Sequence, residues 1–305
     1  MINITAIIVA KNNPPHFLQS VQSIENFASE IIIGNIHIDK DLLLKLKPNK
    51  KVIIVELPDS IAYADLIKEK LKKLAKYEYI LYLDPDEIFP REAIKVIDKK
   101  IDQFDYFYFP RKNIIFGKWI EHSRWWPDYQ LRFFKKDYVI WPKKLHPEPK
   151  AKGVGFTFYP EVRYAILHYN YRNIDEYLEK AIRYAKSEAS MYIEKKINLT
   201  LSETLKKALG EFISRFFACD GYKDGMHGLT LAIFQMFYYF LVYTYYWERK
   251  KYFIVEKNTL LDGIKQFFIS AANEINYWMT YKKLISLKDK YRIKIFNKIL
   301  SVIGK

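Results

Sequence analysis

The sequence contains a single cysteine, Cys219, among its 305 residues. One thiol excludes a disulfide framework within the chain and any zinc or iron–sulfur site built from several cysteines, and it fits a reducing compartment. The first residues, MINITAIIVAKNN, lack the basic segment and the small-residue cleavage site of a signal peptide, so we expect a strand there. A hydrophobic share of 50% with 28% charged residues excludes a disordered or collagen-like chain.

Acidic residues are in the minority, with 35 Asp and Glu against 50 Lys and Arg, which gives a net charge of +15. A basic surface suits nucleic acid, anionic lipid or a substrate that carries phosphate. Lys, Ile, Asn and Tyr are also the residues that an AT-rich genome makes abundant. The charge excess alone therefore does not choose among these partners.

The first half of the chain alternates short apolar runs with segments of helical spacing. Such a pattern predicts an α/β fold whose sheet, mainly parallel, is covered on both faces. In sheets of this kind ligands bind at the carboxyl ends of the strands. The apolar runs are Ile2–Ala10, Ile31–Ile33, Val52–Val55 and Tyr79–Leu83, and the helical segments are His16–Phe27 and Tyr63–Ala75.

Two changes of character follow along the chain. From about Asp105 to Tyr171 the sequence is rich in Trp, Pro and Phe, with short strand-like pieces at Tyr106–Pro110, Gln130–Phe134 and Val139–Trp141. From Asn173, a candidate helix cap, the pattern is helical, with further helices predicted from Ser202, over Thr230–Trp247 and over Thr259–Leu284. The composition shift near residue 200 predicts a domain at 1–200 and a helical region at 201–305.

Three carboxylates, Asp84, Asp86 and Glu87, follow the run Tyr79–Leu83 directly. Carboxylates crowded at the mouth of a buried strand repel one another, and a divalent cation relieves that repulsion. Oxygen ligands alone indicate Mg²⁺ or Mn²⁺. The alternative is that Asp84 caps the helix expected to follow.

Several motifs of this chain occur in the same order in a known protein family. The segments ITAIIVAKNN and YILYLDPDE, with Arg111–Asn113, Phe116–Ile120 and Trp126–Phe134, resemble the family 2 glycosyltransferases. The resemblance is closest to the subgroup of the lipopolysaccharide core glucosyltransferases. It extends over most of residues 2–250, and its further matches are His146–Glu148, Leu167–Tyr171 and the Gly-rich stretch Asp220–Gly228.

The resemblance implies a GT-A-like nucleotide-sugar-binding domain with a mixed, mainly parallel sheet, followed by an α-helical C-terminal region. It also implies a nucleotide-sugar donor and transfer with inversion. By this resemblance Asp86 reaches a Mn²⁺ or Mg²⁺ ion, and Asp84 lies nearer the ribose. His168, at the end of an apolar run, is a candidate to complete the metal shell or to donate to phosphate, or it is structural.

Inversion needs a base that takes the proton of the acceptor hydroxyl. Asp128, between Pro127 and the predicted strand, is our first candidate, and Glu148 is the second. The alternative for Asp128 is a turn aspartate after proline. Arg132 is predicted to pair with the diphosphate or to form a structural salt bridge with the acidic cluster. The expected donor-binding residues are Ala10, Asn12, Asn35, Asp84 and Arg132.

Two tryptophans, Trp125 and Trp126, are predicted to form a stacking platform for an acceptor sugar, or else to belong to the core. The chain also departs from the family pattern. Asn13 and Asn35 stand where the family has acidic residues, which puts the contact with the donor's base in doubt. Lys68-Glu69 stands where the family often has Arg-Asn.

The C-terminal third carries two signals for a membrane. The stretch Leu229–Trp247 is nearly uninterrupted in its apolar character, and we favour a monotopic or core helix over a span because it holds five tyrosines. Residues Lys282–Lys305 hold eight basic residues against one acid, Asp289, around an apolar stripe. This pattern is typical of a membrane-surface anchor, with a solvated face packed on the domain as the alternative.

Together these features predict an inverting, metal-dependent glycosyltransferase that acts on a cell-envelope or lipid-linked glycan. We expect it in the cytoplasm, held peripherally at the inner face of the cell membrane through its C-terminal helices. The alternatives are a non-catalytic sugar- or nucleotide-binding member of the same fold and a basic nucleic-acid-binding protein. We expect no nucleic acid as a partner, because the basic residues of the first half match no known recognition motif.

Overall fold

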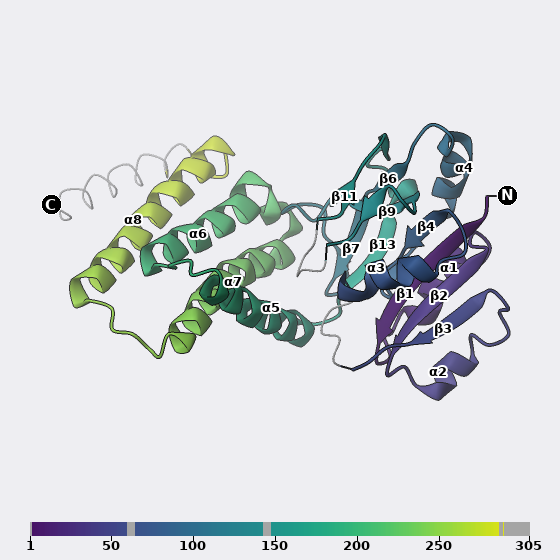
Figure 1. Cartoon of the computed structure of the whole chain (residues 1–305). Coiled ribbons are helices and arrows are strands. Elements are labelled where there is room, and N and C mark those ends of the chain that lie inside the picture. Colours follow the sequence, from purple (N-terminus) through teal and green to yellow (C-terminus); the bar gives the residue numbers. More distant parts are fainter. Residues whose placement is uncertain (1, 60–64, 143–147, 287–288, 290–305) are drawn as a thin grey trace. The chain divides into compact units, whose positions relative to one another are not determined.

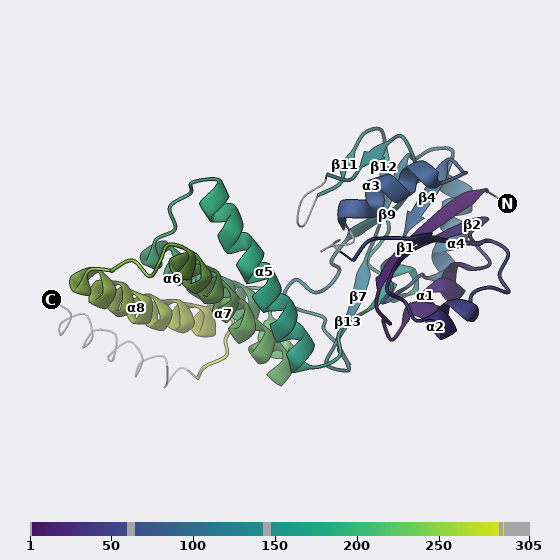
Figure 2. The same ribbon diagram turned by 60° about the horizontal axis from the view of Figure 1, so that its bottom comes forward.

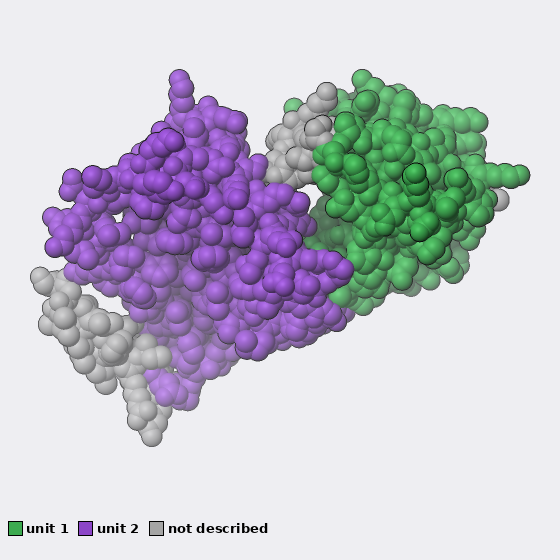
Figure 3. Space-filling view, turned by 90° about the horizontal axis from the view of Figure 1, so that it is seen from below, with its two compact units in different colours: residues 1–114, 125–170 green, residues 115–124, 171–305 purple. Residues whose placement is uncertain are grey.

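A computed structural model describes residues 2–59, 65–142, 148–286 and 289. The chain divides into two compact units, which Figure 3 colours separately. Unit 1 comprises Met1–Ile114 and Trp125–Asn170, and unit 2 comprises Ile115–Arg124 and Tyr171–Lys305. The division differs from the predicted boundary near 200, because the helix that begins at Ile174 packs with the helices that follow it.

Unit 1 is built on a seven-stranded sheet of order β12-β6-β9-β4-β1-β2-β3 (Figure 1). β9 runs antiparallel to both of its neighbours, whereas the other neighbouring strands of this sheet pair in parallel. The predicted class, an α/β fold with a mixed, mainly parallel sheet followed by a helical C-terminal region, is confirmed. The strands are β1 (Ile4–Lys11), β2 (Glu30–Ile36), β3 (Val52–Glu56), β4 (Tyr79–Tyr82), β6 (Tyr106–Phe109), β9 (Gln130–Lys135) and β12 (Gly155–Thr157).

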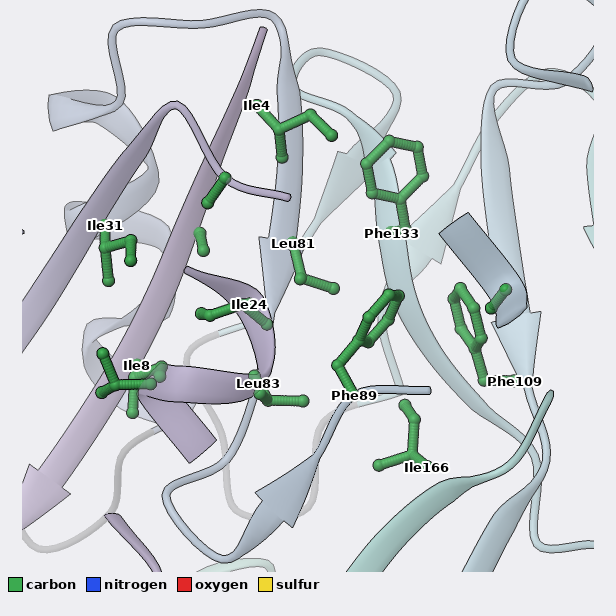
Figure 4. Packing of buried hydrophobic residues seen from close by; sticks show 14 of the residues in the cluster. Ile4, Ile8, Ile24, Ile31, Leu81, Leu83, Phe89, Phe109, Phe133 and Ile166 are labelled. Carbon is green, nitrogen blue, oxygen red and sulfur yellow. The ribbon is translucent and has the colours of Figure 1, made fainter. Parts of the chain in front are cut away.

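Both faces of this sheet are covered, as the continuous apolar runs predict. Side chains alternate along β1, so Ile4 and Ile8 point to one face and Ile7 and Val9 to the other. The first face, shown in Figure 4, packs against α1 (Phe17–Ile24) and α4 (Arg91–Lys100). The second packs against α3, which is described over Asp65–Leu74; residues 63–64 of the predicted helix lie outside the described residues. A short helix, α2 (Lys40–Leu44), follows β2.

The strand order places a switch point at β1. The chain proceeds from β1 outward to β2 and β3, and β4 then pairs with the opposite edge of β1. Loops diverge at such a point and leave a crevice at the carboxyl ends of the strands. Close packing beside it requires Gly34, because a Cβ there would lie 2.9 Å from the Cδ1 atoms of Leu57 and Leu71.

Three strands of a second, four-stranded sheet follow one another in the order β5 (Glu87–Ile88), β13 (Ile166–Tyr171) and β7 (Arg111–Ile115). They place polar and charged side chains near the turn that follows β4. Elsewhere in unit 1, β10 (Val139–Ile140) pairs with β11 (Lys150–Ala151), and a 3₁₀ turn, η1, spans Val162–Tyr164.

Over its described residues unit 2 is mainly helical, with one short strand of its own, β8 (Lys118–Trp119). Asn173 caps α5 as predicted, since its side chain accepts from the Glu176 N–H. The next helix begins one residue before the predicted Ser202, because Thr200 forms a capping box with Glu203. The elements are α5 (Ile174–Glu194), α6 (Leu201–Ile213), the π-helix η2 (Ser214–Ala218), the 3₁₀ turn η3 (Gly221–Asp224), α7 (Met226–Arg249) and α8 (Lys257–Tyr281), of which Figure 2 gives a second view.

The aromatic stretch that the sequence marks as membrane-like forms α7. In the part of the chain that the structure describes, α7 is the one helix long and apolar enough to cross a membrane, by length and composition only. It packs against α5 and α6 and buries Leu231, Ala232 and Val242. Only 28% of its apolar window is buried by these contacts.

Candidate active site

The turn after β4 carries a buried ion pair rather than a helix cap. Asp84 Oδ2 lies 2.5 Å from an Arg132 Nη2 atom, which also donates to Glu87 Oε1 at 2.6 Å. Glu87 is fully buried and Arg132 nearly so. The helix that follows has Pro90 at its N-cap. Of the two predicted roles of Arg132, the structure shows the salt bridge with the acidic cluster.

A second arginine, Arg111 on β7, joins this cluster to Asp128. Its Nε and Nη2 atoms lie 2.8 and 2.7 Å from Asp128 Oδ2, and its Nη1 lies 3.4 Å from Glu87 Oε1. Two guanidinium groups therefore face three carboxylates in a largely buried space. Because each partner compensates the desolvation of the other, the cluster is stable only as a set.

The charge pattern sets the ionisation of both aspartates. Burial would raise the pKa of Asp84, but Arg132 and Lys68 outweigh burial and hold that pKa well below its ordinary value. Burial would likewise raise the pKa of Asp128, and the nearby Arg111 together with a hydrogen bond from Asn113 lowers it instead. Both carboxyl groups are therefore ionised at neutral pH.

Asn113 connects the Asp128 carboxylate to His168. It is fully buried on β7, and its Nδ2 donates to Asp128 Oδ2 at 2.8 Å and to the Trp125 carbonyl at 2.7 Å. Its Oδ1, which can only accept, lies 2.6 Å from His168 Nδ1. The proton of a neutral His168 is therefore on Nδ1, which leaves the Nε2 lone pair facing Asp86 Oδ2 at 3.6 Å.

Asp86 and His168 are the two residues predicted to bind a metal, and the structure brings them together. Their facing atoms, a carboxylate oxygen and an imidazole lone pair, are ligand types that divalent cations accept. Among the described residues no group of three or more His, Cys, Asp or Glu side chains is arranged to hold a metal ion. An ion held by this pair would need its remaining ligands from a bound substrate and water.

The predicted donor-binding residues line up along the carboxyl edge of the sheet. Ala10 on β1 is in register with Asn35 on β2, which is in register with Glu56 on β3. Asn35 Nδ2 donates to both Glu56 carboxylate oxygens, at 2.9 and 2.8 Å. Asn12 follows β1 with a φ of +57°, in the left-handed region. At position 35, where the resemblance leads us to expect an acid, this chain has Asn35, and the carboxylate of Glu56 on the next strand lies against it.

Three residues of this network were not predicted as site residues: Arg111, Asn113 and Glu56. Arg111 and Asn113 are two apart on one strand, so their side chains share a face, and that spacing was the available signal. Glu56 ends an apolar run, where chemistry is expected, but only the sheet order shows that its neighbour is Asn35. Lys68, noted only as a departure from the family, is buried with its Nζ 3.4 Å from Asp84 Oδ1.

The remaining predicted residues are Glu148, Trp125 and Trp126, of which Trp125 joins this network through its backbone carbonyl. Glu148 is exposed, and residues 146–147 of its motif lie outside the described residues. Together with burial and Tyr106, it raises the pKa of Tyr108. Trp125 and Trp126 are half-buried. Trp126 precedes Pro127 through a cis peptide bond, and Asp128 follows with a φ of +37°.

No protein-family model matches this chain. Among solved structures, S. aureus TarS 1-349 is similar at 13% identity with a TM-score of 0.44, over 80% of this chain and 91% of that one. TarS 1-349 in complex with UDP-GlcNAc is similar at 14% identity with a TM-score of 0.37, over 45% of this chain and 46% of that chain. A putative nucleotide-diphospho-sugar transferase from Desulfovibrio desulfuricans G20 has 15% identity and a TM-score of 0.30, over 45% and 65%. The chain spans less than half the length of three of the TarS structures that it matches.

Proposed function

We propose that this protein is a GT-A-type glycosyltransferase that moves a sugar from a nucleotide-sugar donor to an acceptor hydroxyl, with inversion at the anomeric carbon. One observation carries the proposal. Beside the turn that follows β4, Asn113 holds a candidate base, Asp128, and a candidate metal ligand, His168, in one network. Glycosyl transfer needs both functions within reach of the same donor.

Asp128 has one carboxylate oxygen suited to the role of base. Its Oδ2 accepts from Arg111 and Asn113, whereas Oδ1, among the described residues, accepts one hydrogen bond, from Gln130 at 3.1 Å. Oδ1 therefore retains a lone pair that takes the proton of the acceptor hydroxyl as the glycosidic bond forms. The lowered pKa of Asp128 keeps it in the unprotonated form that this step requires, and it makes the group a weaker base than an isolated aspartate.

Asp86 and His168 are the residues that would hold Mn²⁺ or Mg²⁺. Such an ion would offset the negative charge that develops on the leaving nucleoside diphosphate. The chain prepares this pair through Asn113, which fixes the ring of His168 with Nε2 toward Asp86. Arg132, by contrast, is committed to Asp84 and Glu87 and supports the site as an ion-pair partner.

The acceptor follows from the sequence-based expectations. We propose a cell-envelope or lipid-linked glycan, with Trp125 and Trp126 as the stacking surface for its sugar. We also propose that the enzyme works at the inner face of the cell membrane. Most of the predicted basic anchor, 287–288 and 290–305, lies outside the described residues. Lys282, one of its eight cations, is bound to Asp220 at 2.7 Å within unit 2.

A donor-hydrolysis and transfer assay over several nucleotide sugars, with and without Mn²⁺, tests this proposal. We expect Asp86→Asn to abolish metal-dependent turnover. Asp128→Asn should lower turnover by about 10²–10⁴ while the protein stays folded. Asp98→Asn, on the exposed surface of α4, is the matched control and should change nothing. Full activity in EDTA would contradict the metal dependence. A loss of turnover in Glu148→Gln but not in Asp128→Asn would assign the role of base to Glu148.

One observation supports the second candidate, a non-catalytic member of the same fold. Asn13 and Asn35 replace the expected acids, and the Asn35 amide is engaged by Glu56 and by the Ile38 N–H. Calorimetry distinguishes the two. Tight binding of a nucleotide sugar without hydrolysis or transfer under any metal would identify a binding protein.

A further inference from the structure

The connection between α7 and α8 presents an apolar tip to solvent. Ile254 is 92% exposed, and its neighbours Tyr252 and Phe253 are 57% and 37% exposed. The tip is held in place by Trp247, whose Nε1 donates to the Phe253 carbonyl at 2.7 Å. The Trp247 ring also meets the Tyr252 ring edge-on at 4.9 Å. The exposure therefore belongs to a loop with its own fixed contacts.

Cations surround this tip. Arg249, Lys250 and Lys251 precede it and Lys257 follows it, and all four are exposed. Against them stand Glu248 and Glu256, which leaves a net positive charge around the apolar residues. Figure 1 shows the connection at one end of the helical unit.

The apolar surface continues on α8. Leu261, Ile264 and Phe268 are spaced by three and four residues, so they share one face of the helix. The same spacing leads on to Ala271 and Ile275, which pack against the cluster that α6 and the π-helix form. Leu261, Ile264 and Phe268 themselves are 55%, 41% and 65% exposed. Among the described residues of α8 none is fully buried, so its stripe extends beyond its protein contacts.

We infer that the tip Tyr252–Val255 and the stripe Leu261–Phe268 insert into the headgroup region of an anionic lipid bilayer. Tyr and Trp prefer this region, where the ring is buried and the polar atom stays hydrated. The flanking Lys and Arg match the negative surface of anionic lipids, and this charge complementarity selects a membrane over an uncharged partner. The inference rests on the proposed location at a membrane but not on the proposed chemistry.

Vesicle flotation of the full chain tests the inference, with phosphatidylcholine alone and with phosphatidylserine added. We expect binding to the anionic vesicles that weakens with salt, and at least about a tenfold loss of partitioning in Ile254→Glu and in Lys250→Glu/Lys251→Glu. Val162→Glu in unit 1, where the native residue is 48% exposed, is the matched control and should bind as wild type does. Thermal unfolding confirms that each variant is folded.

Three outcomes would overturn the inference. The first is equal binding of Ile254→Glu and wild type to anionic vesicles. The second is loss of binding only on truncation after Asp289, which would assign the lipid contact to the tail. The third is a concentration-dependent dimer that Ile254→Glu abolishes without any vesicle binding, which would make a second copy the occupant. None of these measurements uses a donor, so failure of the glycosyltransferase proposal is seen separately.

Discussion

At the scale of single residues, the candidate site depends on charge balance in a buried space. Arg132 is 4% exposed and shares two carboxylates, Asp84 and Glu87. Arg111 performs the same role from β7, a strand of the other sheet, between Glu87 and Asp128. Removing one member leaves an uncompensated buried charge, which is costly even where the intact set contributes little net stability.

The first prediction concerns Arg132. Arg132→Met should lower the free energy of unfolding by about 3–5 kcal/mol, because Asp84 and Glu87 then lose their counter-charge. Urea unfolding measures this value. Arg163→Ala, which removes an exposed pair with Glu161, is the control and should cost less than about 1 kcal/mol. An equal decrease in the free energy of unfolding in both variants would show that the ion pairs of Arg132 matter no more to stability than an exposed pair.

The second prediction concerns acid. The folded-state pKa of Asp128 lies below its unfolded value of about 3.9, so its contribution to stability is complete above that value and is lost as the pH falls through the folded pKa. Asp128→Asn should therefore lose less stability than wild type on going below about pH 4. The folded-state pKa of Asp84 is also lowered, so Asp84 too stabilises the fold less as the pH falls. Part of the wild-type loss of stability in acid should therefore remain in Asp128→Asn.

Urea midpoints measured from neutral pH downward test this second prediction. Asp98→Asn on exposed α4 should follow the wild-type curve. A decline in Asp128→Asn as steep as in wild type would mean that the ion pair with Arg111 does not govern the acid response.

At the scale of elements, the start of α7 depends on two glycines. A Cβ on Gly228 would lie 1.8 Å from the Gly221 carbonyl oxygen, and a Cβ on Gly221 would lie 2.2 Å from Ser123 Oγ. The obstacle to Gly228 is backbone, which cannot rotate away as a side chain does. The Gly-rich stretch before the aromatic helix is therefore a packing requirement of unit 2.

The third prediction compares two helical glycines. Gly228→Ala should destabilise the protein by about 1–3 kcal/mol or more, because the added methyl group overpacks against backbone. Gly210→Ala in α6, where nothing lies within 4 Å of the new Cβ, should stabilise it by about 0.5–1 kcal/mol. Thermal unfolding of both variants checks the sign, and a stabilised Gly228→Ala would contradict the packing at the start of α7.

At the scale of the whole molecule, the chain forms two units and enters the second one twice. Residues 115–124 belong to unit 2 although unit 1 surrounds them in sequence. Asp224, which is buried, holds this excursion by accepting from the backbone N–H of His122 at 3.0 Å. A cut near residue 200 therefore separates α5 from the helices on which it packs.

The fourth prediction concerns that cut. In a fragment of residues 1–200, α5 loses contacts such as the tilted ring contact of Tyr177 with Phe234 and the hydrogen bond from Tyr238 to Glu188. Because helices in proteins gain most of their stability from packing, we expect α5 to exchange its amide hydrogens far faster in this fragment than in the full chain. Protection of Ile174–Glu194 equal to that in the full chain would restore the boundary near 200.

The sequence by itself determined the local structure. Continuous apolar runs such as Ile31–Ile33 and Tyr79–Leu83 require burial on both faces, so they predicted the strands and the α/β class. Asn173 marked the start of a helix because its short polar side chain satisfies an N–H that the helix leaves open. The closeness of Asp84, Asp86 and Glu87 follows from their adjacency in the chain.

Only the tertiary structure decided which distant groups meet. That Asp128 is bound by Arg111, that Asp86 faces His168 and that Asn35 is held by Glu56 depend on strand order and register. Apolar patterns report that a strand is buried but not which strand lies beside it, because any covered neighbour buries the same surface. The boundary lies at 170 rather than 200 for the same reason. The apolar face of α5 indicates that the helix packs on another element, but the sequence does not show that this element is α7.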